Sequence, residues 1–356
     1  MYIPLEYINR GLLFLRNNNL RSRKKLATLM FYATDLCDSM CKHCYIWKKR
    51  PVKFMSKNKI VEIMNSNCIT KNTTIGLEGG EFLLHPEANE IMEWLQKYHP
   101  KYDLLSNCLK PENTIEASRK YTPKRLYISL DGREETYKYM RGKKGYPRVL
   151  SVLKELKDEL PISIMFTLTP FNSDVEDLQH VAEICKEHQV DLRVGIYNNI
   201  AFFDTQEMAH KNQDSYVIPE IVKDFKENYD FLILYNEWKS GNLKMPCHSI
   251  LDSLVILPNG DVPICQNLNT MLGNVYEKSL DEIFNSAETQ DLHYEHQYNC
   301  NKCWINFHRK YDVAIYRSFE SFFPKSVISK MFGYYQWTAD ADMTYTQYFK
   351  HNNGSH

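Results

Sequence analysis

The sequence lacks a net charge, an export signal and any long apolar run. Its 356 residues carry 44 Lys plus Arg and 44 Asp plus Glu, giving a formal net charge of +0, so nothing favours nucleic acid or an anionic membrane as partner. No stretch approaches the about 18 uncharged apolar residues of a membrane-spanning helix. The first apolar run precedes the basic cluster and has no small-residue cleavage site, so no signal peptide is expected. We therefore expect a cytoplasmic protein that binds no nucleic acid.

Composition and patterning divide the chain into five segments: an N-terminal helix (1–26), a strand and helix region (27–200), an irregular connecting segment expected to set specificity (201–244), a small cysteine-bearing module (245–310) and an aromatic-rich tail (311–356). We expect the helix and the tail to pack on the body of the protein. Attachment of the helix to a membrane surface, or an exposed binding surface on the tail, is the alternative.

Apolar runs alternate with segments of helical period in the second region. The strands are predicted at 27–34, 73–78, 102–106, 125–130, 162–168 and 191–197, and the helices at 57–66, 87–98, 111–120, 146–158 and 174–188. Six such units predict an α/β fold, a partial (β/α)6 barrel of the TIM type. Ligand sites are then expected in the loops after the strands.

Three of the ten cysteines lie within eight residues, directly after the first predicted strand. Cys37, Cys41 and Cys44 have the spacing C-x3-C-x2-C. Three thiolates can hold three corners of a four-iron cluster and leave the fourth iron open. A structural zinc site is the alternative, but it needs a fourth ligand, for which His43 is the only local candidate.

The segment CDSMCKHC, at the end of a first barrel strand, resembles the signature of the radical S-adenosylmethionine (SAM) superfamily. The resemblance implies a [4Fe-4S] cluster whose open iron binds the amino and carboxylate groups of SAM. It also implies reductive cleavage of SAM to a 5′-deoxyadenosyl radical, which removes hydrogen from a substrate. His43 would lie against the adenine, with an ordinary surface histidine as the alternative.

Further segments resemble SAM-binding positions of the same family. The resemblance implies that a Gly-Gly-Glu segment meets the SAM ammonium, that polar side chains after the third and fourth strands face the cofactor, and that an arginine pairs with the SAM carboxylate. A solvated loop residue is the alternative for that arginine. The positions are Gly79, Gly80 and Glu81, then Ser106 and Asn107, then Ser129 and Asp131, and Arg141, with looser matches at Leu168, Asn172, Gly195 and Ile196.

Four later cysteines form a second set: Cys247, Cys265, Cys300 and Cys303. Their spacing suits zinc or a four-iron cluster. Behind such a barrel, they and a hairpin signal at Pro-Asn-Gly-Asp resemble the auxiliary-cluster module called SPASM, in its shortened form called twitch. Because no cysteine follows Cys303, the resemblance implies one auxiliary [4Fe-4S] cluster, fully ligated by protein and suited to electron transfer.

Three cysteines remain outside both sets. Cys185 lies on the apolar stripe of a predicted helix, where buried packing is expected. Cys108 follows a strand whose loop should face the cofactor, so we hypothesise that it is catalytic and returns a hydrogen atom to a substrate radical. No role is assigned to Cys68.

The resemblance favours a radical SAM oxidoreductase or maturase whose substrate is a peptide or protein side chain, changed by oxidation, cross-linking or epimerisation. Modification of a small molecule, such as an amino sugar, a cofactor or a lipid precursor, is the alternative. So few residues precede the first strand that a separate peptide-recognition domain is not expected there. A structural metal-binding scaffold is the non-enzymatic alternative. The cluster would take its electron from a donor such as flavodoxin or ferredoxin.

Overall fold

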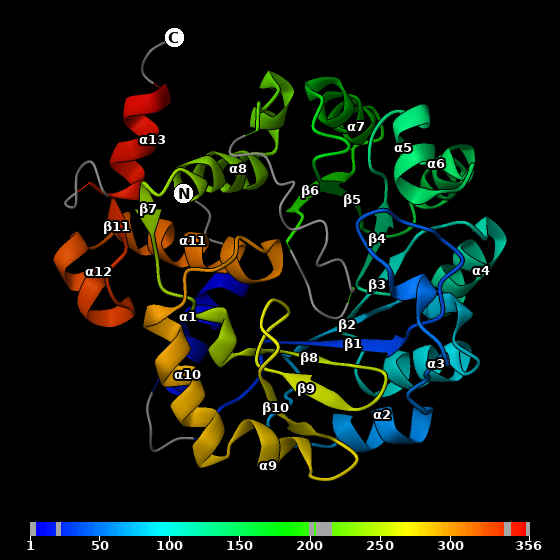
Figure 1. The fold of residues 1–356 in the computed structure, drawn as a ribbon, viewed down its shortest axis with the longest axis horizontal. Helices are drawn as coiled ribbons and strands as arrows, with labels where there is room; N and C mark the ends of the chain where they lie inside the picture. The colour runs from blue at the N-terminus through cyan, green and yellow to red at the C-terminus, as the bar shows by residue number, and fades with distance from the viewer. Residues whose placement is uncertain (1–4, 19–22, 199–202, 204–215, 338–342, 354–356) are drawn as a thin grey trace.

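The computed structural model describes residues 5–18, 23–198, 203, 216–337 and 343–353. Its centre is a seven-stranded parallel sheet with the strand order β6-β5-β4-β3-β2-β1-β8. The sheet curls into a half-barrel (Figure 1), which confirms the predicted fold class. The strands are β1 (Thr28–Thr34), β2 (Thr74–Gly79), β3 (Tyr102–Ser106), β4 (Arg125–Ser129), β5 (Ile162–Leu168), β6 (Asp191–Ile196) and β8 (Ser253–Ile256).

Helices between the barrel strands cover the outer face of the sheet (Figure 1). All five helices predicted from the pattern are present, and one that was not predicted, α5, ends at Arg141. Gly142 ends α5 in the left-handed conformation, with φ of 63°. The helices are α2 (Lys57–Met64), α3 (Ala88–Tyr98), α4 (Pro111–Tyr121), α5 (Glu134–Arg141), α6 (Tyr146–Leu156) and α7 (Val175–Glu187), with short 3-10 turns at Ile46–Lys48, Phe82–Leu84, Glu220–Asp224 and Ser249–Leu251.

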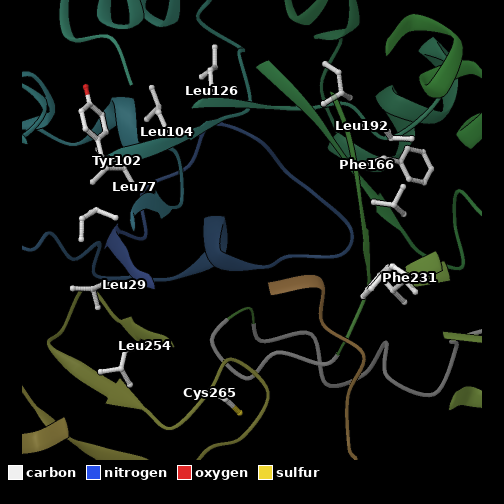
Figure 2. Packing of buried hydrophobic residues seen from close by; sticks show 14 of the residues in the cluster. Leu29, Leu77, Tyr102, Leu104, Leu126, Phe166, Leu192, Phe231, Leu254 and Cys265 are labelled. Atoms are coloured by element: carbon white, nitrogen blue, oxygen red, sulfur yellow. The ribbon is translucent and has the colours of Figure 1, made fainter. Parts of the chain in front are cut away.

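The two faces of the sheet differ in chemistry. Alternate side chains of the strands point outward and form a buried apolar layer against the helices, which Figure 2 shows for Leu29, Leu77, Leu104, Leu126 and Leu192. The side chains between them, many of them polar, point into the half-barrel. The fold therefore uses one face for stability and leaves the other for a ligand.

The first strand of the cysteine-bearing module belongs to the barrel sheet. The predicted turn is present, since Gly260 has φ of +88° and its N–H donates to Leu257 O at 2.9 Å. The predicted hairpin is not, because the strands on either side of the turn belong to different sheets. The strand before it, β8, pairs in parallel with β1, with Thr28 opposite Ser253. The other elements of the module are β9 (Asp261–Pro263), β10 (Met271–Asn274), α9 (Leu280–Phe284) and α10 (Ala287–Asn299).

Both ends of the chain pack on the body, as expected. Arg10 in α1 forms a buried ion pair with Asp252, with Nη2 2.8 Å from Oδ1. Tyr316, Tyr335 and Tyr345 of the aromatic tail are buried and contact one another. The elements concerned are α1 (Leu5–Asn17), α8 (Lys226–Lys239), β7 (Leu243–Lys244), α11 (Asn306–Glu320), α12 (Lys325–Phe332), β11 (Gln336–Trp337) and α13 (Tyr345–Asn353).

Two sequence predictions concern parts of the chain only partly described. Residues 201, 202 and 204–215 of the expected connecting segment lie outside the described residues, and the rest of it includes α8 and a 3-10 turn. Within the described ranges, no helix has the length and apolar character needed to cross a membrane.

Candidate active site

A cavity of about 610 Å³ lies inside the half-barrel. The first turn of α11 and the residues before it cover the open side between β6 and β8. Asn306 Nδ2 donates to Val194 O of β6 at 2.6 Å, and Ile305 packs in one cluster with Val255 of β8. The cavity therefore lies between the sheet and a segment that directly follows the last cysteine, Cys303.

The three predicted cysteines lie together at the mouth of this cavity. Cys37, Cys41 and Cys44 all line it, and all belong to the loop after β1, residues 35–45, called here the three-cysteine loop. Ser39 Oγ lies 3.1 Å from Cys41 Sγ. Burial raises the pKa of Cys44 to about 12, so its thiolate form needs a compensating cation such as cluster iron.

Gly79 and Gly80, at the end of β2, bring the loop that follows this strand against the three-cysteine loop. Gly80 N donates to Thr34 O, and Glu81 N donates to Leu36 O, both at 2.7 Å. A Cβ at Gly80 would lie 2.0 Å from Leu36 O, and Gly79 has φ of +131°. Only glycine permits this approach of two backbones, which leaves the edge of the loop open to a ligand.

Glu81 is a buried carboxylate that faces the cavity. Oε1 accepts a hydrogen bond from Ser106 Oγ at 3.0 Å, and Oε2 accepts one from Asn107 N at 2.7 Å. Burial raises its pKa to about 7, and among the described residues it has no ion-pair partner. A buried carboxylate of this kind is completed by a cation, which fits an ammonium group.

Arg141 lines the cavity, but Asp131 does not. Asp131 is fully buried behind Arg141: its Oδ2 accepts from Arg141 Nε at 2.6 Å and its Oδ1 accepts from Thr167 N at 2.8 Å. Arg141 Nη1 also lies 3.6 Å from Cys41 Sγ. Asp131 was expected to contact SAM, but it does not line the cavity. It instead orients the guanidinium of Arg141.

His43 is buried at the cavity wall, and its Nδ1 has no hydrogen-bond partner among the described residues. Burial lowers its pKa to about 4, so the ring is neutral near pH 7. A neutral ring with one unused nitrogen can stack on, or bond to, a polar heterocycle.

The remaining sequence candidates divide into those that reach the cavity and those that do not. Asn172 is used structurally, since its Nδ2 donates to Asp131 O and Thr167 O. Ser106 donates a hydrogen bond to Glu81 and can therefore affect a ligand only through that carboxylate. The cavity is lined by Asn107, Ser129, Gly195 and Ile196, but not by Ser106, Leu168 or Asn172.

Cys108 is not brought to the cavity. Its side chain is 1% exposed and belongs to the apolar core, and its thiol contacts Ser106 O at 3.9 Å. Its backbone has φ of 56°, and Cys108 is not among the residues that line the cavity. Nothing in its surroundings supports the expected hydrogen-atom return, which requires direct access to the substrate.

Glu78 and Tyr32 are among the cavity residues that the sequence analysis missed. Glu78 of β2 lies opposite Tyr32 of β1 in the strand register, and both line the cavity. Burial raises the pKa of Glu78 to about 7, with Arg193 lowering it and Asp103 raising it. Tyr32 Oη accepts a hydrogen bond from Gln266 Nε2 at 2.8 Å. The alternation of side chains along β2 was the signal that could have identified Glu78.

The second set of cysteines lines a separate, small cavity. Cys247, Cys265, Cys300 and Cys303 meet there, beside His308 and Arg309. No group of three or more His, Cys, Asp or Glu side chains within the described residues is placed to hold a single metal ion. Four thiols that line one cavity are a donor set that suits an iron-sulfur cluster.

Arg309, also missed from the sequence, organises this second site. Its guanidinium is buried and donates to the carbonyl oxygens of Met245 at 3.1 Å, Pro246 at 2.7 Å and Cys303 at 3.2 Å. These carbonyls flank two of the four cysteines. Burial raises the pKa of Cys247 and of Cys303, and the positive charge of Arg309 opposes that rise.

Comparison with protein families gives two matches. A family model described as the radical SAM superfamily matches residues 31–185, and one described as an iron-sulfur cluster-binding domain, SPASM, matches residues 247–304. The first contains the three-cysteine loop, Glu81 and Arg141. The second spans all four cysteines of the second cavity.

Two sequence relatives come from Bacillus subtilis (strain 168). The antilisterial bacteriocin subtilosin biosynthesis protein AlbA is 26% identical over 74% of this chain and 60% of its own length. The sporulation killing factor maturation protein SkfB is 24% identical over 43% of this chain and 38% of its own length. The chain thus spans less than two thirds of either relative.

Solved structures of SuiB from Streptococcus suis share the fold. The complex with the precursor peptide SuiA aligns with a TM-score of 0.60 and 14% identity, covering 81% of this chain and 70% of SuiB. The complex with SAM aligns with a TM-score of 0.59 and 16% identity, covering 75% and 68%.

Proposed function

The chain belongs to the radical SAM superfamily and carries a SPASM-type iron-sulfur domain, and from this premise we propose that it modifies a peptide or protein side chain as an oxidoreductase or maturase. The cofactors of these domains are [4Fe-4S] clusters and SAM. AlbA and SkfB, named for the biosynthesis and maturation of a bacteriocin and a killing factor, support the peptide as substrate class. The cavity that begins at the three-cysteine loop carries the proposal, because it has room for a substrate side chain beside these thiols.

When bound, the first cluster and SAM supply a 5′-deoxyadenosyl radical by one-electron reductive cleavage. Cys37, Cys41 and Cys44 would hold the cluster. Glu81 would bind the SAM ammonium, since it is a buried carboxylate on the cavity wall with no ion-pair partner among the described residues. Arg141, oriented by Asp131, would bind the carboxylate.

Other residues of the cavity would fix the rest of SAM and the substrate. His43 and Asn107 would bind and orient the nucleoside end, for which the unused ring nitrogen of His43 gives the reason. The loop from Ile305 to Phe307 would exclude water from the open side. Cys247, Cys265, Cys300 and Cys303 would hold the auxiliary cluster, which would supply one-electron transfer chemistry when bound.

Cluster content and SAM cleavage test the first part of this proposal. Protein reconstituted without oxygen should hold about eight irons per chain and release 5′-deoxyadenosine with dithionite. Replacing Cys37, Cys41 and Cys44 with Ala should leave about four irons and no release. About one zinc, little iron and no release in the parent protein would instead mean structural metal sites.

Deuterium transfer tests the substrate class. Extracts of deuterium-labelled cells of the source organism are split into a peptide fraction and a small-molecule fraction, and each is incubated with the reconstituted enzyme and unlabelled SAM. Deuterium should be transferred to 5′-deoxyadenosine from the peptide fraction. This transfer should disappear when that fraction is first treated with protease. Transfer only from the protease-resistant small molecules would overturn the peptide assignment. The Cys37→Ala variant is the control for non-enzymatic exchange.

A further inference from the structure

A second cavity, of about 620 Å³, lies outside the barrel against the three-cysteine loop. Cys41 and Trp47 line both this outer cavity and the inner one. Trp47 Nε1 donates to Cys41 O at 3.4 Å, so the wall between the two cavities is formed by a cluster cysteine and a side chain bonded to it. The outer cavity is therefore a short route from the protein surface to the first cluster.

The surface around the outer cavity is basic. Lys42, Lys48 and Lys138 line it together with a single acid, Glu135, whose Oε2 lies 3.8 Å from Lys138 Nζ. Lys42 Nζ lies 4.3 Å from the ring centre of Tyr139, and Lys48 Nζ lies 3.8 Å from that of Tyr45, so aromatic rings support two of the cations without neutralising them.

Two separate stretches of sequence build this surface. The residues that line it all come from 40–48 and 135–142, in which Glu135 is the one acid, although the whole chain has equal numbers of acids and bases. Backbone hydrogen bonds join them, from Met40 N to Arg141 O and from Lys42 N to Met140 O, both at 2.9 Å. Gly142 allows the contact, since a Cβ there would lie 2.8 Å from Met40 Cβ. The concentration of positive charge at this place is thus local and not a consequence of net charge.

We propose that this outer basic cavity is the docking surface of an acidic one-electron carrier protein of the flavodoxin or ferredoxin class. The inference rests on the proposed function, because it requires a redox cluster at Cys37, Cys41 and Cys44. One electron leaves the reduced carrier and reduces the oxidised cluster, and no bond or proton changes. Opposite charges favour such an encounter and make its rate fall with salt. A carrier docked here approaches the cluster without entering the substrate cavity.

The test compares two reductants of the same reconstituted enzyme. The triple variant Lys42→Gln, Lys48→Gln and Lys138→Gln is assayed for 5′-deoxyadenosine release from SAM with reduced flavodoxin and with dithionite, which needs no docking site. The flavodoxin-driven rate should fall at least about tenfold at low salt and lose its salt dependence. The dithionite-driven rate and the iron content should not change.

The control variant neutralises three exposed lysines on outer helices, Lys97→Gln, Lys120→Gln and Lys154→Gln, and should match the parent with both reductants. An unchanged flavodoxin-driven rate in the Lys42, Lys48 and Lys138 variant would overturn the proposal. No release from the parent with dithionite would instead refute the proposed function.

A cross-link on the unmodified protein keeps the proposal testable if the triple variant does not fold. Carbodiimide should join flavodoxin carboxylates to Lys42, Lys48 or Lys138. Cross-links confined to other lysines would overturn the proposal. Cross-links from these three lysines to an acidic peptide but not to flavodoxin would also overturn it.

Discussion

A methyl group added at Gly80 would strike the backbone that leads into the three-cysteine loop. The Cβ of Gly80→Ala would lie 2.0 Å from Leu36 O and 2.5 Å from Leu36 C. Neither atom belongs to a flexible side chain, so the two loops must separate. Separation stretches the bonds from Gly80 N to Thr34 O and from Glu81 N to Leu36 O.

The cost follows from these contacts. Losing both hydrogen bonds costs about 2 kcal/mol, at about 1 kcal/mol each, and overpacking adds roughly 1 to 3 kcal/mol. Gly80→Ala should therefore lower the free energy of unfolding by about 3 kcal/mol or more. Because Leu36 directly precedes Cys37, the variant should also bind fewer iron atoms per chain than the parent after reconstitution.

Urea denaturation of the iron-free protein gives the stability, and iron analysis after reconstitution gives the cluster content. The matched control is Gly195→Ala, in which the new Cβ has no neighbour closer than Phe166 O at 4.0 Å. If Gly80→Ala and Gly195→Ala unfold at the same urea concentration and hold the same iron, the close approach of the two loops is not what supports the cluster site.

Three further predictions concern buried charges. Arg309→Met removes the donor to the carbonyls around the second cysteine set and should lower the iron content from about eight to about four per chain, whereas unchanged iron would contradict that role. Glu81→Gln should weaken SAM binding in equilibrium dialysis about tenfold or more while the iron content stays constant, because it removes the buried negative charge. Burial raises the pKa of Glu78 to about 7, above the about 4.3 of an unfolded chain. The stability that the protonated carboxyl contributes is therefore fully present below about pH 4.3 and is lost as the pH rises through about 7. Glu78→Gln should thus gain stability relative to the parent between pH 5 and pH 8, by about 2 kcal/mol, in urea denaturation; equal pH dependence would refute the shift.

Local patterns predicted the barrel well because its elements carry strong periodicity. The six predicted strands agree with β1 to β6 within about a residue or two at each end. Helix α5 was missed because its sequence, EETYKYMR, is short and mostly polar, so the sequence did not place Arg141 on a helix. The cysteines of both sets were identified from spacing and resemblance, and the structure brings each set to one cavity.

Long-range arrangement could not be read from the sequence. Nothing local shows that Asp131 lies behind Arg141 and not beside the ligand, because that depends on how β4, α5 and β5 pack. Likewise, Arg309 reaches carbonyls more than 60 residues away. Cys108 was placed in the correct loop, but its backbone conformation decides where the thiol points.

The parallel pairing of β8 with β1 means that the cysteine-bearing module cannot be removed as a unit. A chain shortened before β8 would turn β1 from an interior strand into an edge strand, with unpaired backbone groups along Thr28 to Phe31. Such a fragment would be prone to self-association through that edge. Chimeras with other barrels should therefore exchange β1 and β8 together, so that both sides of the junction keep the strand pairing they evolved with.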